Sequence, residues 1–215
     1  MSRLFHGCMQ GRVMYVVPYL LGPPGSPAAR VGVQVTDSPY VVANLRLLNR
    51  IGRVALEHFG NQADFVKCIH SVGTMDPEHR YICQFPEENL IISVNTNYGS
   101  DAILSRKCHA LRLASVQARH EGWLAEHMTV FGVTSPDGVR TFMAGAFPAS
   151  CGKTNLAMLL PPDADLAKGW KVEVIGDDIA WMHFGDDGRL YAVNPEAGFF
   201  GVATGTSSES NPTAM

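Results

Sequence analysis

The sequence predicts a mixed α/β protein of the α+β type, and three local patterns carry that prediction. A helix start at residues 38–39 precedes a helical apolar stripe, two β-branched runs between residues 128 and 143 flank a turn, and a strand–loop–helix pattern covers residues 141–160. Hydrophobic residues make up 46% of the 215 residues and charged residues 17%, which excludes a disordered chain. The length is enough for one large domain or two small ones.

Two helices are expected in the first half of the chain. Ser38 can cap a helix whose first residue is Pro39, and Gly60 is suited to the helix end. Between them runs an apolar stripe with helical spacing, made of Val42, Leu45, Leu48, Ile51, Val54, Leu56 and Phe59. A second helix is expected from about residue 101 to about residue 120, with Gly122 beyond its end and an apolar face of Ile103, Leu104, Leu111 and Leu113.

The second half of the chain is rich in strand signals. Met128–Val133 and Val139–Met143 are strand-like runs on either side of Thr134–Gly138, whose Ser-Pro-Asp-Gly chemistry is typical of a turn. Lys171–Ile175 is a further short strand with β-branched residues. We therefore place a domain change near residue 128, with a helix-rich part before it and a strand-rich part after it.

Charge, hydropathy and cysteine content exclude several protein classes. The formal net charge of −3 gives no reason to expect a basic face for nucleic acid. The longest apolar stretch, Val13–Leu21, contains Pro18 and is about half of the ~20 residues that a membrane-spanning helix needs. The five cysteines lack CxxC spacing, so neither a disulfide framework nor a zinc site is indicated. We expect a cytoplasmic protein that binds neither nucleic acid nor membranes.

The strongest local signal for function is the loop Ala146-Phe-Pro-Ala-Ser-Cys-Gly-Lys-Thr-Asn155. A strand leads into it and a helix is expected to follow, so that backbone N–H groups would point at a phosphate. Lys153 would reach the β- and γ-phosphates of a nucleotide, and the Thr154 hydroxyl would bind the nucleotide's Mg²⁺. The usual phosphate loop has glycine where this chain has Phe147. Cys151 lies close to Lys153 and ahead of the helix, an environment that favours a reactive thiolate.

Two adjacent aspartates, Asp177 and Asp178, follow the next strand after this loop. Nucleotide-dependent enzymes hold a divalent cation with carboxylates at such strand ends. The alternative interpretation is a solvated Asp-Asp turn. Composition gives no reason to single out His127, since a lone histidine is more often structural than a ligand. The same holds for Lys107, because only a neutral amine can bind a metal ion.

The loop Phe147–Asn155, in which cysteine precedes Gly-Lys-Thr-Asn, and the block Gly176–Met182 resemble the phosphate loop and second kinase motif of one known family. That family is the GTP-dependent phosphoenolpyruvate carboxykinases. Further blocks similar to it, in the family's order, are Gly7–Arg12, Thr36–Val42, His70–Gly73, Glu121–Met128 and Asn194–Ala203. The resemblance implies that residues 1–127 are part of the N-terminal substrate-binding domain. It implies that residues 128–215 begin the C-terminal nucleotide-binding domain.

The resemblance also implies a reaction and a set of catalytic groups. The family converts oxaloacetate and GTP to phosphoenolpyruvate, GDP and CO₂, so cations are needed to stabilise an enolate and a migrating phosphoryl group. Carried over by position, Lys107, His127 and Asp178 would bind a catalytic Mn²⁺, whose charge would hold Lys107 as a neutral amine. Thr154 and Asp177 would serve the Mg²⁺ or Mn²⁺ of the nucleotide. Catalytic roles would fall to Cys151, Lys153 and Lys107.

Binding residues and partners follow from the same resemblance. The residues expected to bind GTP or GDP are Ser150, Cys151, Gly152, Lys153, Thr154, Asn155 and Asp177. The residues expected to face oxaloacetate or phosphoenolpyruvate are Tyr98, Gly99, Ser100 and Ala149. We expect the full-length enzyme to be a monomer that acts in gluconeogenesis.

Four residues depart from the family's pattern. Ser100 adds a side chain where close backbone approach is expected, and Ala149 removes a hydroxyl from a substrate-facing position. Arg106 stands where lysine is usual beside the metal ligand, and arginine cannot release a proton there. Thr204 replaces a proline, which should loosen the following loop. We expect these changes to affect substrate fit and rate more than nucleotide binding.

Family chains extend further on both sides, so the resemblance leads us to expect an internal piece or a truncated member. A working carboxykinase is the main hypothesis. The alternatives are a non-catalytic nucleotide- or Mn²⁺-binding remnant, one part of a split enzyme, and a generic phosphate-loop kinase. For the 215 residues alone we expect weak binding of GDP or GTP with Mn²⁺ and no formation of phosphoenolpyruvate.

Overall fold

The computed structural model describes residues 2–59, 64–97, 103–148, 151–159, 162–199, 205 and 207–210. The chain folds into two compact units. The first unit comprises Met1–Gly122 and Pro195–Gly198, and the second comprises Trp123–Asn194 and Phe199–Met215. The chain therefore leaves the second unit after Asn194, contributes a short segment to the first unit, and returns.

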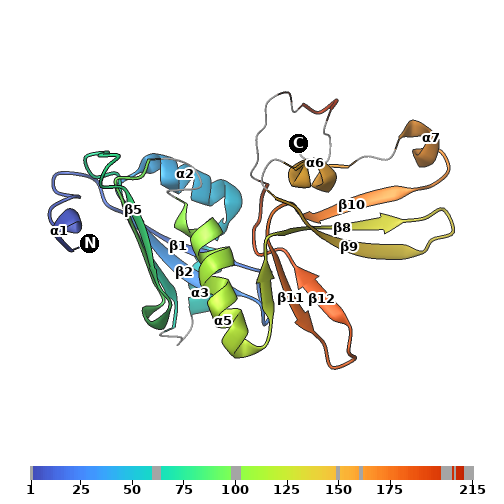
Figure 1. Cartoon of the computed structure of the whole chain (residues 1–215), viewed down its shortest axis with the longest axis horizontal. Helices are drawn as coiled ribbons and strands as arrows, with labels where there is room; N and C mark the ends of the chain where they lie inside the picture. The colour runs from blue at the N-terminus through green and yellow to red at the C-terminus, as the bar shows by residue number, and fades with distance from the viewer. Residues whose placement is uncertain are drawn as a thin grey trace. The chain divides into compact units, whose positions relative to one another are not determined.

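A six-stranded mixed sheet forms the first unit (Figure 1). Its strand order is β3-β1-β2-β4-β6-β5, in which β2, β4 and β6 are parallel neighbours and the other pairs are antiparallel. The strands are β1 (Tyr15–Leu21), β2 (Arg30–Thr36), β3 (Arg50–Ile51), β4 (Val66–Ser71), β5 (Tyr81–Phe85) and β6 (Leu90–Val94). The sequence analysis identified two helices of this part but not its sheet. A buried parallel strand such as β6, Leu-Ile-Ile-Ser-Val, reads as an apolar run without alternation, so its period does not identify it as a strand.

Two short helices replace the single helix predicted from Ser38 to Gly60. Ser38 Oγ accepts a hydrogen bond from the Val41 backbone N–H, which confirms the predicted cap, and α2 (Pro39–Leu48) follows. The chain then forms β3, turns at Gly52 with a φ of 72°, and continues as α3 (Arg53–Phe59). The predicted apolar stripe fails beyond this break, where Val54 and Leu56 are 38% and 58% exposed. Pairing of β3 with β1 thus overrides the continuous helical pattern.

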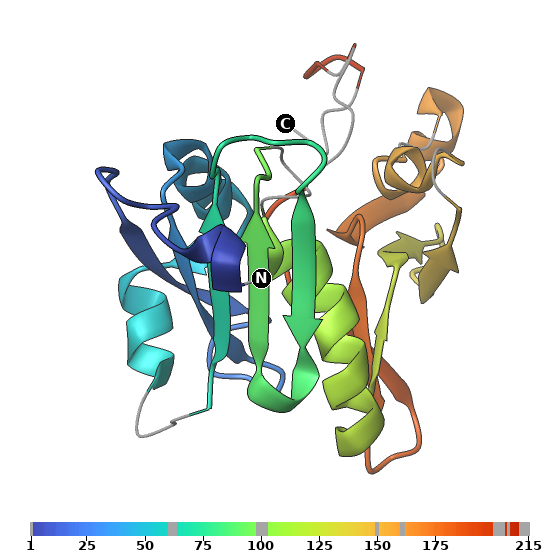
Figure 2. The same cartoon turned by 60° about the vertical axis from the view of Figure 1, so that its left-hand side comes forward.

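A continuous helical stretch occupies the place predicted for the second helix. It consists of η2 (Leu104–Leu113), which has π-helical hydrogen bonding, and α5 (Ala114–Glu121), and it ends at Gly122 with a φ of 80°. Of the predicted apolar face, Leu111 is half-buried and the other three residues are buried. η2 packs against β2, β4 and β6, and the light-green helix of Figure 2 runs alongside the sheet. No helix in the described part of the chain is long and apolar enough to cross a membrane.

Two three-stranded antiparallel sheets form the second unit, in the orders β10-β8-β9 and β12-β11-β7. The predicted hairpin is confirmed, with a Ser135–Gly138 turn between its strands, and so is the strand β10. The elements are β7 (Leu124–Glu126), β8 (Met128–Thr134), β9 (Arg140–Ala146), α6 (Lys153–Ala157), α7 (Asp163–Leu166), β10 (Lys171–Gly176), β11 (Ala180–Phe184) and β12 (Leu190–Val193). The buried residues Val130, Ala180 and Met182 pack together as a core for this unit.

Candidate active site

The predicted phosphate loop lies between β9 and α6. β9 ends at Ala146 and α6 begins at Lys153, so the predicted order of strand, loop and helix is confirmed. The helix covers Lys153–Ala157, so it begins directly after Gly152, within the motif itself. α6 packs against β8 and β10, which fixes the start of the helix beside the end of the strand that carries the aspartates.

The other predicted residues of the loop differ in their exposure. Cys151 and Asn155 are exposed, Gly152 is half-buried, and Lys153 is only 8% exposed. The remaining predictions fall outside the described residues: Tyr98, Gly99, Ser100, Ala149, Ser150, Thr204 and the side chain of Thr154.

Lys153 belongs to a buried charged cluster in the second unit. Its Nζ donates to Asp178 Oδ1 over 2.6 Å and to the Asp178 backbone oxygen over 3.0 Å. His127 Nε2 donates to the same Oδ1 over 2.7 Å. The side chains of Lys153 and Asp178 are 8% and 9% exposed, so the two buried charges compensate each other. Residues from α6, from the end of β10 and from the β7–β8 junction therefore meet at one carboxylate oxygen.

The two predicted aspartates are buried rather than solvated. Asp177 is fully buried and Asp178 is 6% exposed, so the alternative of a solvated Asp-Asp turn is wrong. The backbone just before them is held closely, because Thr129 Oγ1 donates to the Gly176 carbonyl over 2.9 Å. A Cβ at Gly176 would lie 2.8 Å from Asn194 Cγ, so this strand end requires glycine. Buried carboxylates on a fixed backbone are suited to binding a cation.

The donor types at Asp178 fit a divalent cation. A carboxylate oxygen and an imidazole nitrogen are ligands that Mn²⁺ accepts, and the Lys153 ammonium shows that this oxygen attracts positive charge. Two of the three predicted metal ligands, His127 and Asp178, are thus in direct contact. The third, Lys107, lies half-buried in η2 of the first unit. Within the described residues, no three His, Cys, Asp or Glu side chains are grouped to hold a metal ion.

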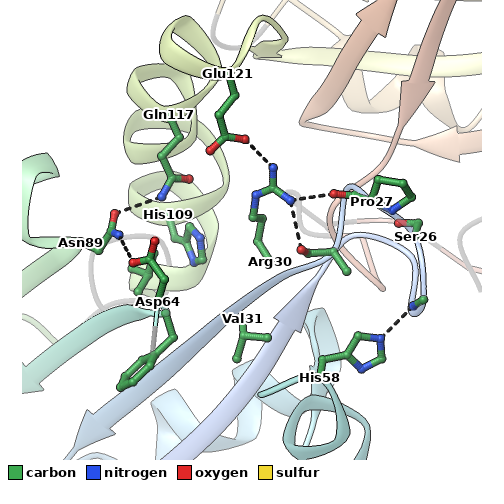
Figure 3. Close-up of a pocket in the computed structure, with 14 residues that line it drawn as sticks. Ser26, Pro27, Arg30, Val31, His58, Asp64, Asn89, His109, Gln117 and Glu121 are labelled. Atoms are coloured by element: carbon green, nitrogen blue, oxygen red, sulfur yellow. Dashed lines mark hydrogen bonds and ion pairs between the residues drawn. The ribbon is translucent and has the colours of Figure 1, made fainter. Parts of the chain in front are cut away.

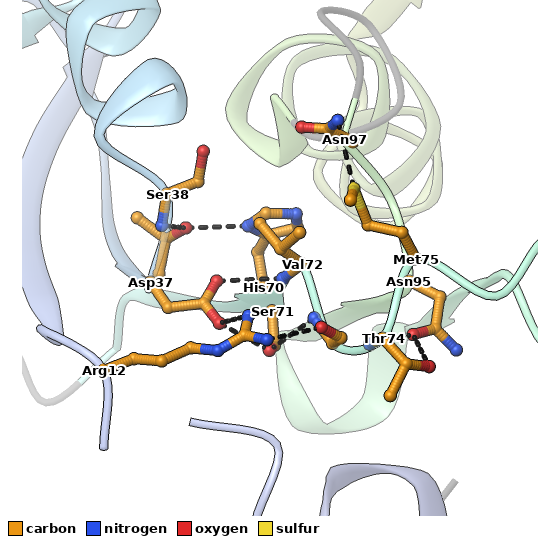
Figure 4. Close-up of polar contacts among 12 residues, drawn as sticks. Arg12, Asp37, Ser38, His70, Ser71, Val72, Thr74, Met75, Asn95 and Asn97 are labelled. Atoms are coloured by element: carbon orange, nitrogen blue, oxygen red, sulfur yellow. Dashed lines mark hydrogen bonds and ion pairs between the residues drawn. The ribbon is translucent and has the colours of Figure 1, made fainter. Parts of the chain in front are cut away.

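A second polar centre lies in the first unit where the parallel strands β2 and β4 end, and it was not predicted from the sequence (Figure 4). The Asp37 carboxylate accepts hydrogen bonds from Arg12 Nη1 over 2.9 Å, from Ser71 Oγ over 2.8 Å and from the Val72 backbone N–H over 2.8 Å. Arg12 Nη2 also donates to the Gly73 carbonyl over 2.6 Å. One feature of the sequence could have predicted this centre. Asp37 follows β2 and Val72 follows β4, and the carboxyl ends of parallel strands meet at one edge of a sheet.

The same edge leads into the predicted substrate block. His70 lies between Thr36 Oγ1, 2.7 Å from Nδ1, and the Thr96 carbonyl, 2.8 Å from Nε2. Burial lowers the pKa of His70, which favours the neutral ring that donates through Nε2 and accepts through Nδ1. Asn95 Oδ1 accepts from the Thr74 backbone N–H over 3.0 Å. The described residues extend to Asn97, directly before Tyr98. This network therefore holds the segment that precedes the predicted substrate-binding residues.

A cavity of about 570 Å³ also lies in the first unit, and its described lining residues include none of the predicted site residues (Figure 3). Arg30 donates to Glu121 there over 2.6 Å. Fully buried His109 lines the cavity, and its Nδ1 lies 2.7 Å from Tyr19 Oη, which is 3.2 Å from Cys68 Sγ. Burial, with a contribution from Arg30, lowers the pKa of His109 to about 3, and burial raises the pKa of Cys68 to about 12. Both groups are uncharged at neutral pH, which fits a structural role.

Comparison with known proteins identifies the family. Residues 1–119 match the family described as the phosphoenolpyruvate carboxykinase N-terminal domain, and residues 123–215 match the phosphoenolpyruvate carboxykinase C-terminal P-loop domain. The chain is 52% identical over 215 residues to the phosphoenolpyruvate carboxykinase [GTP] of Anaeromyxobacter sp. (strain K), covering all of this chain and 36% of that protein.

Two further relatives, from other organisms, are also phosphoenolpyruvate carboxykinases [GTP] by name. The protein of Treponema pallidum (strain Nichols) is 52% identical over 229 residues, with 100% of this chain and 36% of that protein covered. The human mitochondrial protein is 53% identical over 224 residues, with 98% of this chain and 34% of that protein covered. The chain thus spans just over a third of the length of these curated relatives. From both domain matches and these identities, the chain belongs to the family of GTP-dependent phosphoenolpyruvate carboxykinases.

Proposed function

We propose that this chain provides the phosphate-binding and metal-binding groups for the conversion of oxaloacetate and GTP to phosphoenolpyruvate, GDP and CO₂. The observation that supports this most strongly is the cluster of Lys153, His127 and Asp178 beside the phosphate loop. Decarboxylation of oxaloacetate releases CO₂ and leaves an enolate, whose oxygen then takes the γ-phosphoryl group from GTP. Both steps build negative charge, which cationic groups at this cluster would stabilise.

In this proposal Lys153 is the residue that binds the nucleotide phosphates. Its ammonium donates a hydrogen bond to Asp178 Oδ1. Phosphate oxygens carry more negative charge than one carboxylate, so they compete for the ammonium when the nucleotide binds. Transfer of Lys153 to the phosphates would free the Asp178 oxygen for a divalent cation. Backbone N–H groups of the loop, from Ser150 to Thr154, would hold the remaining phosphate oxygens.

From the family resemblance, we propose that the metal ligands are His127, Asp178 and Lys107. A bound Mn²⁺ would supply Lewis-acid stabilisation of the enolate oxygen and of the phosphoryl group. To bind the metal ion through Nε2, His127 would have to give up the proton on that nitrogen, because a protonated ring nitrogen has no free lone pair. Asp177, fully buried after β10, would serve the cation of the nucleotide together with Thr154.

The remaining roles rest on the family resemblance. Tyr98, Gly99, Ser100 and Ala149 would face oxaloacetate or phosphoenolpyruvate, and Asn155 would contact the nucleotide. Exposed Cys151 would lie against the phosphates. We also propose a cytoplasmic monomer that binds no nucleic acid, although the name of the human relative places that protein in mitochondria.

The test is nucleotide binding and turnover with matched lysine variants. Binding of fluorescent GDP in the presence of Mn²⁺ is compared in the parent, in Lys153→Ala and in Lys168→Ala, because Lys168 is an exposed lysine paired only across one helical turn with Asp165. Lys153→Ala should weaken GDP binding by about tenfold or more, since a charge-assisted phosphate contact contributes about 1.5–3 kcal/mol. Lys168→Ala should bind as the parent does.

A coupled assay for phosphoenolpyruvate, with oxaloacetate and either GTP or ATP, is run on the same samples. Any phosphoenolpyruvate formed should require GTP and disappear in Lys153→Ala. Equal GDP affinity in the parent and in Lys153→Ala would contradict the proposed function.

A further inference from the structure

The short segment Pro195–Gly198 joins the first unit although its sequence neighbours belong to the second. Two main-chain hydrogen bonds hold it there. The Gly22 N–H donates to the Pro195 carbonyl over 2.8 Å, and the Ala197 N–H donates to the Leu48 carbonyl over 2.8 Å. The residue between them, Glu196, is therefore fixed at both of its sides against the ends of β1 and α2.

Glu196 forms a buried ion pair with Arg106 of η2. Glu196 Oε1 lies 3.2 Å from Arg106 Nη1, and the two side chains are 0% and 2% exposed. The desolvation cost of burying two charges offsets their attraction, so such a pair adds little stability compared with apolar residues of the same size. A buried pair does fix the direction of its side chains, because a side chain that moved away would leave its partner as an uncompensated buried charge. The Arg106 side chain is thus held in one direction.

Arg106 directly precedes Lys107 in a helix with π-helical hydrogen bonding. Successive side chains in a helix leave the axis in directions that differ by a fixed rotation, so anchoring residue 106 also sets the direction of residue 107. Segments of π-helix are uncommon and often occur at functional sites, where they place a side chain that regular helix geometry would not. Lys107 is half-buried, whereas Arg106 is buried, which shows that the two side chains face different surroundings.

We infer that Glu196, acting through Arg106, is a positioning residue that sets the direction of the Lys107 amine. This inference rests on the proposed function, in which Lys107 is a metal ligand. In this inference Arg106, one of the four residues that depart from the family's pattern, serves as the anchor of the helix. Residues that orient metal ligands without touching the metal typically change affinity by about 10- to 100-fold when they are replaced.

The experiment compares the parent chain, Glu196→Gln, the double variant Arg106→Gln/Glu196→Gln, and the control Glu121→Gln. Glu121 is a matched control because it pairs with Arg30 over 2.6 Å on the same helical stretch but is half-exposed. Mn²⁺ affinity is measured by electron paramagnetic resonance of free Mn²⁺, the melting temperature by circular dichroism, and amide hydrogen exchange by mass spectrometry.

Glu196→Gln should weaken Mn²⁺ binding by about 10- to 100-fold and speed exchange in Leu104–Leu113 more than in Ala114–Glu121. Glu121→Gln should change Mn²⁺ affinity by less than about twofold, as exposed ion pairs contribute little. The double variant no longer buries a lone arginine, so it should recover the melting temperature but not the Mn²⁺ affinity.

Two outcomes separate this inference from the function on which it rests. A parent that binds no Mn²⁺ would overturn the metal assignment, and exchange in Leu104–Leu113 would then still decide whether the pair orders this helix. A parent that binds Mn²⁺, together with Glu196→Gln binding it equally well, would overturn the positioning role alone. Recovery of both melting temperature and Mn²⁺ affinity in the double variant would also overturn it, because the pair would then be merely structural.

Discussion

The two units each contain a buried aspartate bonded to a cationic side chain, but the surroundings of the two carboxylates differ. Asp37 in the first unit accepts from Arg12, from the Ser71 hydroxyl and from a backbone N–H. Asp178 in the second unit shares one oxygen between the Lys153 ammonium and the His127 imidazole. A carboxylate held by backbone and hydroxyl donors fixes neighbouring segments. In the proposed function, the carboxylate that shares an oxygen between a lysine and a histidine would release the lysine to a phosphate and bind a metal ion.

The largest effect on stability should therefore come from Asp37. Asp37→Ala leaves the Ser71 hydroxyl and the Val72 N–H without their acceptor and removes the charge partner of Arg12. We expect the free energy of unfolding to fall by about 3 kcal/mol, measured by urea denaturation. Affinity for GDP with Mn²⁺ should stay unchanged in the variant that remains folded. A tenfold loss of GDP affinity at intact secondary structure would break the distinction between the two aspartates.

Local chemistry in the sequence was enough to predict much of the second unit. The turn at residues 135–138, the strand β10 and the loop before Lys153 each carry their signal within ten residues. The contact of His127 with Asp178 does not, because 51 residues separate them and only the family resemblance connected the two. The network around Asp37 was missed for the same reason, since Arg12 lies 25 residues before it and Ser71 34 residues after it.

The sheet of the first unit shows a different limit of sequence reasoning. β1 coincides with most of the apolar stretch that was considered only as a membrane span, and β6 is an apolar run without alternation. The break between α2 and α3 depends on β3 pairing with β1, a tertiary contact that the helical pattern conceals. Length and periodicity cannot reveal elements whose type is decided by their neighbours.

Acid should destabilise the chain through the buried histidines of the first unit. The folded-state pKa of His109 is about 3, below the ~6.5 of an unfolded histidine. Between these values the unfolded state binds a proton that the folded state excludes, so stability is complete above pH ~6.5 and falls as the pH decreases toward 3. Burial lowers the pKa of His70 as well, which adds to the effect in the same direction.

For His109 the expected slope is about 1.4 kcal/mol per pH unit between these two pKa values. Urea denaturation at pH 7, 6 and 5 measures it for the parent, for His109→Gln and for His120→Gln, because His120 is exposed on α5. His109→Gln should flatten the pH dependence, and His120→Gln should leave it as in the parent. Identical slopes in the parent and in His109→Gln would show that this histidine is protonated in the folded state.

The smallest effect is expected for an exposed ion pair. Arg53 Nε lies 2.8 Å from Glu57 Oε1, four residues along α3, and the side chains are 91% and 57% exposed. Glu57→Gln should change the free energy of unfolding by less than about 0.5 kcal/mol. A larger decrease in the free energy of unfolding, measured by urea denaturation, would show that an exposed ion pair can stabilise this protein as much as a buried one.

The most direct test of the account is the Mn²⁺ affinity of Asp178→Ala beside that of Asp186→Ala. Both variants remove one aspartate of the second unit, but Asp178 is buried at the cluster and Asp186 is exposed. Titration followed by electron paramagnetic resonance should show Asp186→Ala binding Mn²⁺ as the parent does. Asp178→Ala should lose more affinity than the ~10- to 100-fold typical of residues that only orient a ligand. Equal Mn²⁺ affinity in Asp178→Ala and the parent would contradict the assignment of this cluster as the metal and phosphate site.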